Sequence, residues 1–172
     1  MKRRAFCVVG LSLVAVGTSG LLRPLQGAGG TGKSTLSTLS IYCCRSTSTS
    51  ITLKICAGVT GAPAGFSLQW MTADDYAANN CEWSDLACAA SFSGNAKNSR
   101  YRLAAGSCVQ VTVGNFLFDN GASTDCELPL DPDTAYVFRA FAHSNSQVKK
   151  SEWSDTIECE TLSGIMPPPP PS

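Results

Sequence analysis

Histidine is nearly absent from this chain, and its scarcity excludes most familiar catalytic and metal sites. Among 172 residues there is one histidine, His143. A hydrolase triad needs a histidine base beside its nucleophile, and no Gly-x-Ser-x-Gly segment provides the matching elbow. No two cysteines have the Cys-x-x-Cys spacing of zinc or redox motifs. The sequence therefore predicts a protein that is not an enzyme and that has neither a metal site nor a cofactor.

Acidic residues are missing before residue 51, and charged residues are few throughout. Only 15% of the residues are charged, against about 25% in an ordinary soluble protein. All 13 acids lie in residues 51–162, where seven basic residues leave a net charge of −6. Because such a segment repels phosphate backbones, nucleic acid is excluded as a partner. The pairs Asp74–Asp75 and Asp131/Asp133 do not have the alternating ligand pattern of a calcium loop.

The apolar run near the start of the chain is too short to span a membrane comfortably. The run Ala5–Val16 has 12 residues, whereas a spanning helix needs about 20. It follows Lys2, Arg3 and Arg4 and precedes small and polar residues, which is the pattern of a secretory signal peptide. We therefore expect a signal peptide over residues 1–28, cleaved between 17 and 28. The mature protein is then secreted, periplasmic or on the cell surface, with no membrane span; an uncleaved anchor is the alternative.

Residues 29–50 are rich in glycine, serine and threonine, which predicts a flexible linker. The segment Gly27–Ser34 also fits G-x-x-x-x-G-K-[ST], in which Lys33 and Ser34 contact phosphate and magnesium. A phosphate loop needs a strand before it and a helix after it. Pro24 interrupts any strand before the match, and the serines and threonines that follow the match disfavour a helix. Nucleotide binding through Lys33 is therefore only the third hypothesis for function.

Apolar and polar residues alternate from residue 51 onward, and no long helix is predicted. Ile51, Leu53 and Ile55 alternate with polar neighbours, which indicates a strand with one buried face. Six further short strands follow the same reasoning: Phe66–Met71, Leu86–Phe92, Tyr101–Leu103, Cys108–Phe116, Tyr136–Ala142 and Thr156–Thr161. About seven short strands predict an all-β fold, a two-sheet antiparallel immunoglobulin-like sandwich over residues 51–162. Alternatively, the strand at residue 51 is the second, and residues 36–45 form the first.

The segment Leu130–Tyr136 has the form L-x-P-x-T-x-Y and resembles the corner before the sixth strand of fibronectin type III domains. In such a corner Leu130 enters the core, Pro132 makes the turn, and Tyr136 buries its ring while its hydroxyl reaches upstream backbone. Phe138 and the residues after it resemble the closing hairpin of the family, and Trp70 resembles its core tryptophan. The chain is similar to a cysteine-bearing, exported, bacterial variant of this family, and the resemblance covers residues 51–162.

Cysteine is plentiful, and eight of the nine cysteines lie beyond the predicted signal peptide. Scattered cysteines on an exported β-rich chain predict disulfides, and eight allow 105 pairings, so the connectivity stays open. Cys43 and Cys44 are adjacent, so we expect them to bond to different partners, or one to bond to another chain; a free reactive thiol is the alternative. The disulfide candidates are Cys43, Cys44, Cys56, Cys81, Cys88, Cys108, Cys126 and Cys159.

The candidate contact residues are Tyr76, Trp83, Lys149 and Lys150. Large aromatic rings remove much apolar area from water at once and are enriched at binding hot spots. Either ring could instead belong to the core or pack beside Cys81. The two lysines fall in the loop before the last strand, where the resembled family presents binding residues; a solvated loop is the alternative. Residues 163–172 contain a run of prolines, which predicts a stiff polyproline tail.

These features together predict a secreted or surface-associated binding module that is not catalytic and whose partner is a protein or a carbohydrate. A structural or display domain without a specific ligand is the alternative.

Overall fold

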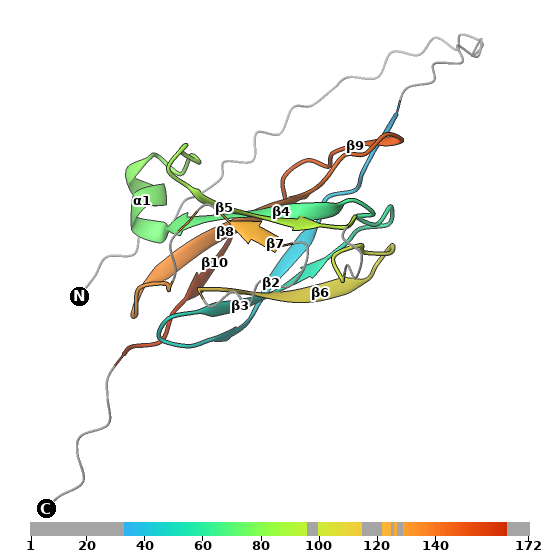
Figure 1. The fold of residues 1–172 in the computed structure, drawn as a ribbon. Helices are drawn as coiled ribbons and strands as arrows, with labels where there is room; N and C mark the ends of the chain where they lie inside the picture. Colours follow the sequence, from blue (N-terminus) through green and yellow to red (C-terminus); the bar gives the residue numbers. More distant parts are fainter. Residues whose placement is uncertain (1–32, 96–99, 115–121, 125, 127–128, 165–172) are drawn as a thin grey trace, which may run out of the picture.

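The computed structural model describes residues 33–164, apart from 96–99, 115–121, 125 and 127–128. The predicted signal peptide over residues 1–28 and most of the proline-rich tail lie outside the described residues. Within the described part the protein is a sandwich of a three-stranded and a five-stranded antiparallel sheet (Figure 1). The predicted all-β, two-sheet antiparallel sandwich is confirmed. No helix in the described ranges is long and apolar enough to cross a membrane.

The three-stranded sheet has the order β2-β3-β6, with β2 at Ser40–Ser46, β3 at Ile51–Cys56 and β6 at Cys108–Val113. The alternation predicted for β3 is present, because Ile51, Leu53 and Ile55 are fully buried. On the outer side, the Thr52 and Thr112 hydroxyls are 3.0 Å apart across β3 and β6. This sheet therefore presents one apolar face to the core and one polar face to water.

The five-stranded sheet has the order β10-β8-β4-β5-β7. Its strands are β4 (Gly65–Thr72), β5 (Cys88–Ser93), β7 (Ala122–Thr124), β8 (Ala135–Ala142) and β10 (Ile157–Glu160). Phe66, Leu68 and Trp70 of β4 alternate inward and are buried. The division of strands, with β2, β3 and β6 in one sheet and β4, β8 and β10 in the other, is that of immunoglobulin-like sandwiches.

The corner before β8 buries its apolar side chains and provides a hydrogen-bond partner for its tyrosine hydroxyl. Leu130 and the Tyr136 ring are each 5% exposed, and the backbone N–H of Asp131 donates to the Tyr136 hydroxyl at 3.0 Å. Burial raises the pKa of Tyr136, since the charged phenolate is poorly solvated there. Pro132 lies at the exposed turn, and Phe138 is fully buried behind the corner. The corner therefore anchors the start of β8 in the core.

The predicted linker over residues 29–50 is wrong from residue 34 onward. Ser34–Thr35 forms β1, which pairs in parallel with β9 (Val148–Lys149), and β2 is an edge strand of the three-stranded sheet. Leu36, Leu39 and Ile41 are 3–5% exposed and belong to the core. Within β2 only one side chain is buried, so the strand lacks a repeated apolar alternation. The alternative, with the strand at residue 51 as the second, agrees with the structure.

Two further strand expectations differ from the structure, and a short helix is present that the sequence did not predict. The predicted strand Tyr101–Leu103 is only an isolated bridge between Leu103 and Ala62, although both predicted end residues are buried. The strand predicted from Leu86 begins at Cys88, and Leu86 is 90% exposed. A short helix, α1 (Ala73–Ala78), follows β4 directly. Each difference falls in residues 72–107.

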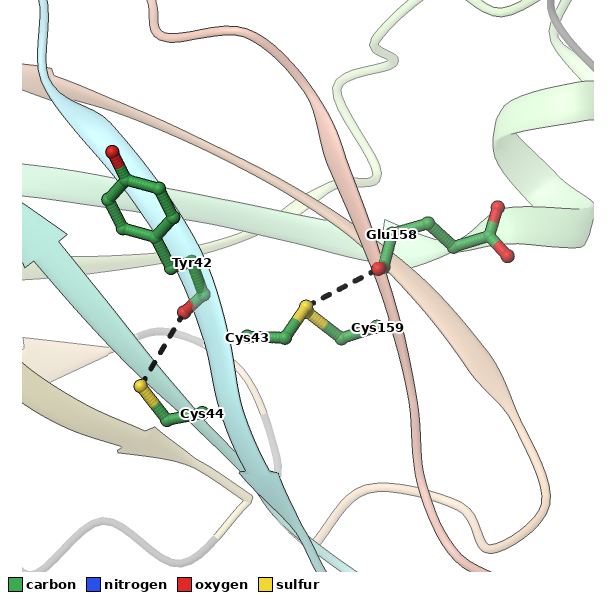
Figure 2. The surroundings of a disulfide bond; sticks show 5 residues. All are labelled: Tyr42, Cys43, Cys44, Glu158 and Cys159. Carbon is green, nitrogen blue, oxygen red and sulfur yellow. Dashed lines mark hydrogen bonds between the residues drawn. A yellow bond between two sulfur atoms is a disulfide. The ribbon is translucent and has the colours of Figure 1, made fainter.

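The described cysteines form three disulfides with one another: Cys43–Cys159, Cys56–Cys108 and Cys88–Cys126. Cys81 is also disulfide-bonded. The first of these bonds joins β2 to β10 and so ties the edge of one sheet to the edge of the other (Figure 2). Cys44 is the exception to the predicted set, since its thiol is free and exposed. It follows Cys43 at the irregularity in β2 and points away from the bond.

Candidate functional site

The outer face of the five-stranded sheet carries the side chains that β4 and β8 turn away from the core. The pairing of these strands sets Met71 opposite Val137, Gln69 opposite Arg139, and Ser67 opposite Phe141. Met71 and Val137 are buried, although they lie on the outer side. Helix α1 contacts β4 and β8 at this end of the face (Figure 1). The face is therefore covered at one end and open at the other.

Arg139 lies at the middle of this face and contacts two tryptophan rings. Its guanidinium carbon is 4.4 Å from the Trp83 ring centroid and 3.9 Å from that of Trp153. Its Nε and Nη2 groups donate to Gln69 Oε1 at 3.0 and 2.8 Å. Burial lowers the pKa of Arg139, but a guanidinium in a protein stays charged. Each contact between the cation and a ring is worth about 0.5–2 kcal/mol.

Further rings extend this arrangement in both directions along the face. Tyr76 lies 5.5 Å from Trp83, and Phe141 lies 4.6 Å from Trp153, measured between ring centroids. All five side chains are partly buried. We call Tyr76, Trp83, Arg139, Trp153 and Phe141 the aromatic row. The row brings together the two predicted contact rings, although it also gives them a packing role within the protein.

Local structure explains how Tyr76 and Trp83 come together. The Thr72 hydroxyl accepts from the backbone N–H of Asp75 at 3.1 Å and caps the start of α1. After the helix, Asn80 and Cys81 adopt the left-handed backbone conformation, with φ of 55° and 61°. The chain thereby reverses, and the Cys81 N–H donates to the Tyr76 carbonyl at 2.9 Å. The Trp83 Nε1 group then donates to the Thr156 hydroxyl at 3.4 Å.

Two serines hold the segment around Trp153 against β8. The Ser151 hydroxyl accepts from the Ala142 N–H at 2.8 Å, and the Ser154 hydroxyl accepts from the Ala140 N–H at 3.0 Å. Both hydroxyls are buried and replace the backbone carbonyls that a regular strand would offer. Trp153, between the two serines, is thus fixed beside Arg139.

Sequence reasoning singled out Trp83 but missed Trp153 and Arg139. One signal was available, because the tetrapeptide Glu-Trp-Ser-Asp occurs twice, at residues 82–85 and 152–155. The two tryptophans of this repeat are the rings that contact Arg139. A search for short repeats would have paired the rings, but nothing in the sequence pairs either with Arg139.

A hollow of about 370 Å³ lies at the open end of the same face. Its lining residues are Ala64, Ser91, Ser93, Asn95, Phe141, His143, Ser144 and Lys150. Of the two predicted lysines, Lys150 lines the hollow, with its Nζ 5.3 Å from the Phe141 ring centroid. Lys149 is exposed in β9 and does not line it.

His143 is held in one orientation at the edge of this hollow. Its Nδ1 lies 3.3 Å from the Ala64 carbonyl oxygen and its Nε2 lies 2.8 Å from the Ser67 hydroxyl. Since a carbonyl can only accept, Nδ1 carries the proton and Nε2 accepts from Ser67. Burial lowers the pKa of His143, although the bond to Ala64 opposes the shift. The imidazole is therefore neutral near pH 7.

The Ser67–His143 pair resembles the nucleophile and base of a hydrolase, but its position in the sheet does not suit acyl transfer. Strand β4 is paired on both sides, with β5 and β8, so its backbone N–H groups belong to the two ladders. Stabilising an oxyanion requires donors aimed at the reacting carbonyl, and the backbone N–H groups of β4 around Ser67 are already used in sheet pairing. Among the described residues, no group of three histidine, cysteine or acidic side chains could hold a metal ion.

The described part of the phosphate-loop match does not have the structure that such a loop needs. Ser34 begins a strand rather than a helix, and the Lys33 Nζ lies 3.5 Å from the Asn145 carbonyl oxygen. Residues 27–32 of the match lie outside the described residues. Nothing here supports nucleotide binding through Lys33.

Comparisons with known proteins give weak likenesses only. No model of a protein family matches the chain, and no curated protein sequence matches it. A solved structure described as a myokine structure is 11% identical, covering 76% of this chain and 99% of its own, with a TM-score of 0.37. The third fibronectin III domain of a human protein is 13% identical, and the match covers 88% of this chain and 98% of that domain, with a TM-score of 0.32. The fold assignment therefore depends on the strands and their pairing.

Proposed function

We propose that this protein is an exported binding module of the fibronectin type III family, without catalytic activity, that binds a protein or a carbohydrate through the outer face of its five-stranded sheet. The observation that carries the proposal is the aromatic row, in which Arg139 contacts two tryptophans on a face that remains partly exposed. Tryptophan, tyrosine and arginine are the residue types most enriched at binding hot spots.

The row is held rigid before any partner arrives, which favours binding. Gln69 accepts two hydrogen bonds from Arg139, and Thr156 accepts one from Trp83. Side chains that are already ordered lose less conformational freedom on association, a loss that otherwise costs about 0.5–1.5 kcal/mol for each flexible side chain. Leu86, three positions after Trp83 in the same loop, is 90% exposed and offers apolar area next to the row in sequence.

The disulfides support export. Three disulfides join described cysteines. Disulfides persist in oxidising compartments and are rare in the cytosol. The predicted signal peptide over residues 1–28 supplies the route to such a compartment. Both observations fit a protein that meets its partner outside the cell or in the periplasm.

Two matched substitutions, each of which replaces an exposed apolar residue with aspartate, test the proposed face. Purified mature protein is applied to arrays of glycans and of extracellular proteins, together with the variants Leu86→Asp and Val59→Asp. Val59 is 86% exposed and lies in a different loop, between β3 and β4. We expect saturable binding that is lost in Leu86→Asp and kept in Val59→Asp. Equal effects of the two variants argue against this face, and a stable monomer without any saturable partner favours a structural or display role.

A further inference from the structure

The hollow at the open end of the outer face has the size of a small-ligand site. Its volume of about 370 Å³ falls within the range of about 300–1,000 Å³ that is usual for ligand pockets. Its walls come from the start of β4, the end of β5, the end of β8 and the loop after β9. The hollow therefore combines strand residues, such as Ser91 and Phe141, with loop residues, such as Ser144 and Lys150.

Hydrogen bonds and one glycine fix the floor of the hollow. The Ala64 carbonyl accepts from the Gly94 N–H at 2.9 Å as well as from His143. The His143 N–H in turn donates to the Gly65 carbonyl at 2.9 Å. Gly65 has φ of +92°, and a Cβ there would collide with the Phe92 carbonyl oxygen, so only glycine fits. The imidazole is thus held by both ring nitrogens and by its backbone.

The charged residue that lines the hollow is opposite in sign to the net charge of the surrounding domain. Residues 51–162 have a net charge of −6, but the described residues that line the hollow include Lys150 and no aspartate or glutamate. Because His143 is neutral near pH 7, Lys150 brings the charge among the described lining residues. One flexible ammonium suits one carboxylate.

The rest of the lining suits a ligand with several hydroxyl groups. Ser91 and Ser144 carry hydroxyls, and Asn95 carries an amide, so each can both donate and accept hydrogen bonds. Phe141 supplies an apolar wall next to these groups. A sugar ring presents hydroxyls along its edge and C–H bonds on its face, and so matches both surfaces.

We infer that this hollow binds a carboxylated sugar of the uronic acid class. Lys150 Nζ meets the carboxylate, Ser91, Asn95 and Ser144 meet the hydroxyls, and Phe141 contacts the ring face. This inference deepens the proposed function and rests on it, since it names the ligand class for one end of the same face. The remainder of the face, around Trp83, is then free to contact the rest of a larger partner.

Titration of the isotope-labelled mature protein with small sugars, followed by NMR, tests the inference. The probes are methyl β-D-glucuronide, the matched neutral methyl β-D-glucoside, and acetate. We expect saturable shifts at Ser91, Asn95 and Ser144 with the glucuronide, and affinity at least about tenfold weaker for the glucoside and for acetate, a factor that corresponds to about 1.4 kcal/mol. A uronate oligosaccharide, as a fourth probe, shows whether a sugar within a chain is bound as well as a single sugar.

Two neighbouring lysines supply the control. Lys150→Gln is expected to weaken glucuronide binding about tenfold, whereas Lys149→Gln, which changes an exposed lysine outside the hollow, is expected to leave it unchanged. The amide spectra of both variants show whether each is folded. An equal loss in both variants overturns the inference, as does equal binding of glucoside and glucuronide, shifts with acetate as large as those with glucuronide, or no saturable shift at all.

The array experiment separates failure of this inference from failure of the proposed function. A partner that depends on Leu86, together with silence toward the glucuronide, removes the sugar assignment and leaves the binding face. Silence in both experiments removes both.

Discussion

Strand β8 carries two phenylalanines that lie on opposite faces of the same sheet. Phe138 is fully buried between the two sheets. Phe141 is partly exposed on the outer face, where it contacts Trp153 and lines the hollow. The two rings are three positions apart and therefore lie on opposite faces, because successive side chains alternate between the faces of a strand. The inner ring therefore contributes to stability, and the outer ring is available for binding.

Replacing each phenylalanine with alanine is the strongest test of this difference. Phe138→Ala leaves a cavity in a close-packed core and is expected to cost about 3–5 kcal/mol. Phe141→Ala removes a ring that is already partly in water, so we expect the smaller loss of about 1 kcal/mol that is typical of single substitutions. Urea unfolding of both variants measures the difference. Similar losses contradict the assignment of the two rings to separate roles.

The second comparison sets the disulfide between the sheets against the free thiol beside it. Cys43–Cys159 closes a separation of 116 residues, and removing both cysteines as serines is expected to cost about 2–4 kcal/mol. Cys44→Ser changes an exposed side chain and is expected to fall within about 0.5 kcal/mol of the parent protein. Thermal unfolding under non-reducing conditions compares them. A large loss from Cys44→Ser indicates that its thiol has a partner in solution.

The third comparison concerns the two tyrosines whose hydroxyls have different surroundings. Tyr136→Phe removes the hydroxyl that accepts from the Asp131 N–H, and such a hydrogen bond contributes about 0.5–1.5 kcal/mol. Tyr42 is 54% exposed, and Tyr42→Phe is expected to change stability by less than about 0.5 kcal/mol. Urea unfolding measures both. Equal values contradict a structural role for the hydroxyl at the corner before β8.

The fourth comparison sets the arginine of the aromatic row against an exposed arginine. Arg139→Lys removes a planar group that contacts two rings and donates twice to Gln69, and an ammonium cannot reproduce that geometry. We expect a loss of about 1–2 kcal/mol and a changed tryptophan fluorescence. Arg45→Lys alters an exposed side chain on β2 and is expected to change neither quantity.

The corner and the aromatic row also differ in how far the sequence predicts them. The corner is local, since residues 130–136 contain the turn, the apolar anchor and the tyrosine whose hydroxyl bonds back to Asp131. The row joins residues 76, 83, 139 and 153, which meet only after three separate segments pack against β8. The alternation of apolar and polar residues predicted the sandwich because it, too, is a local signal. It missed β2, since an edge strand with one buried side chain has no alternation to detect.

The smallest expected effect is the pH dependence that His143 adds to stability. Burial holds its folded-state pKa below that of the unfolded chain, which is about 6.5. The stabilising contribution is therefore fully present above that value, and it is lost as the pH falls below it, because the unfolded chain takes up the proton first. In His143→Gln, stability should fall less between pH 7 and pH 5 than in the parent protein. The carboxyl groups titrate in both proteins, so the difference between their pH profiles isolates the imidazole. Identical profiles show that His143 is solvated as freely in the folded protein as in the unfolded chain, and that the hollow is more open than its hydrogen bonds to Ser67 and Ala64 imply.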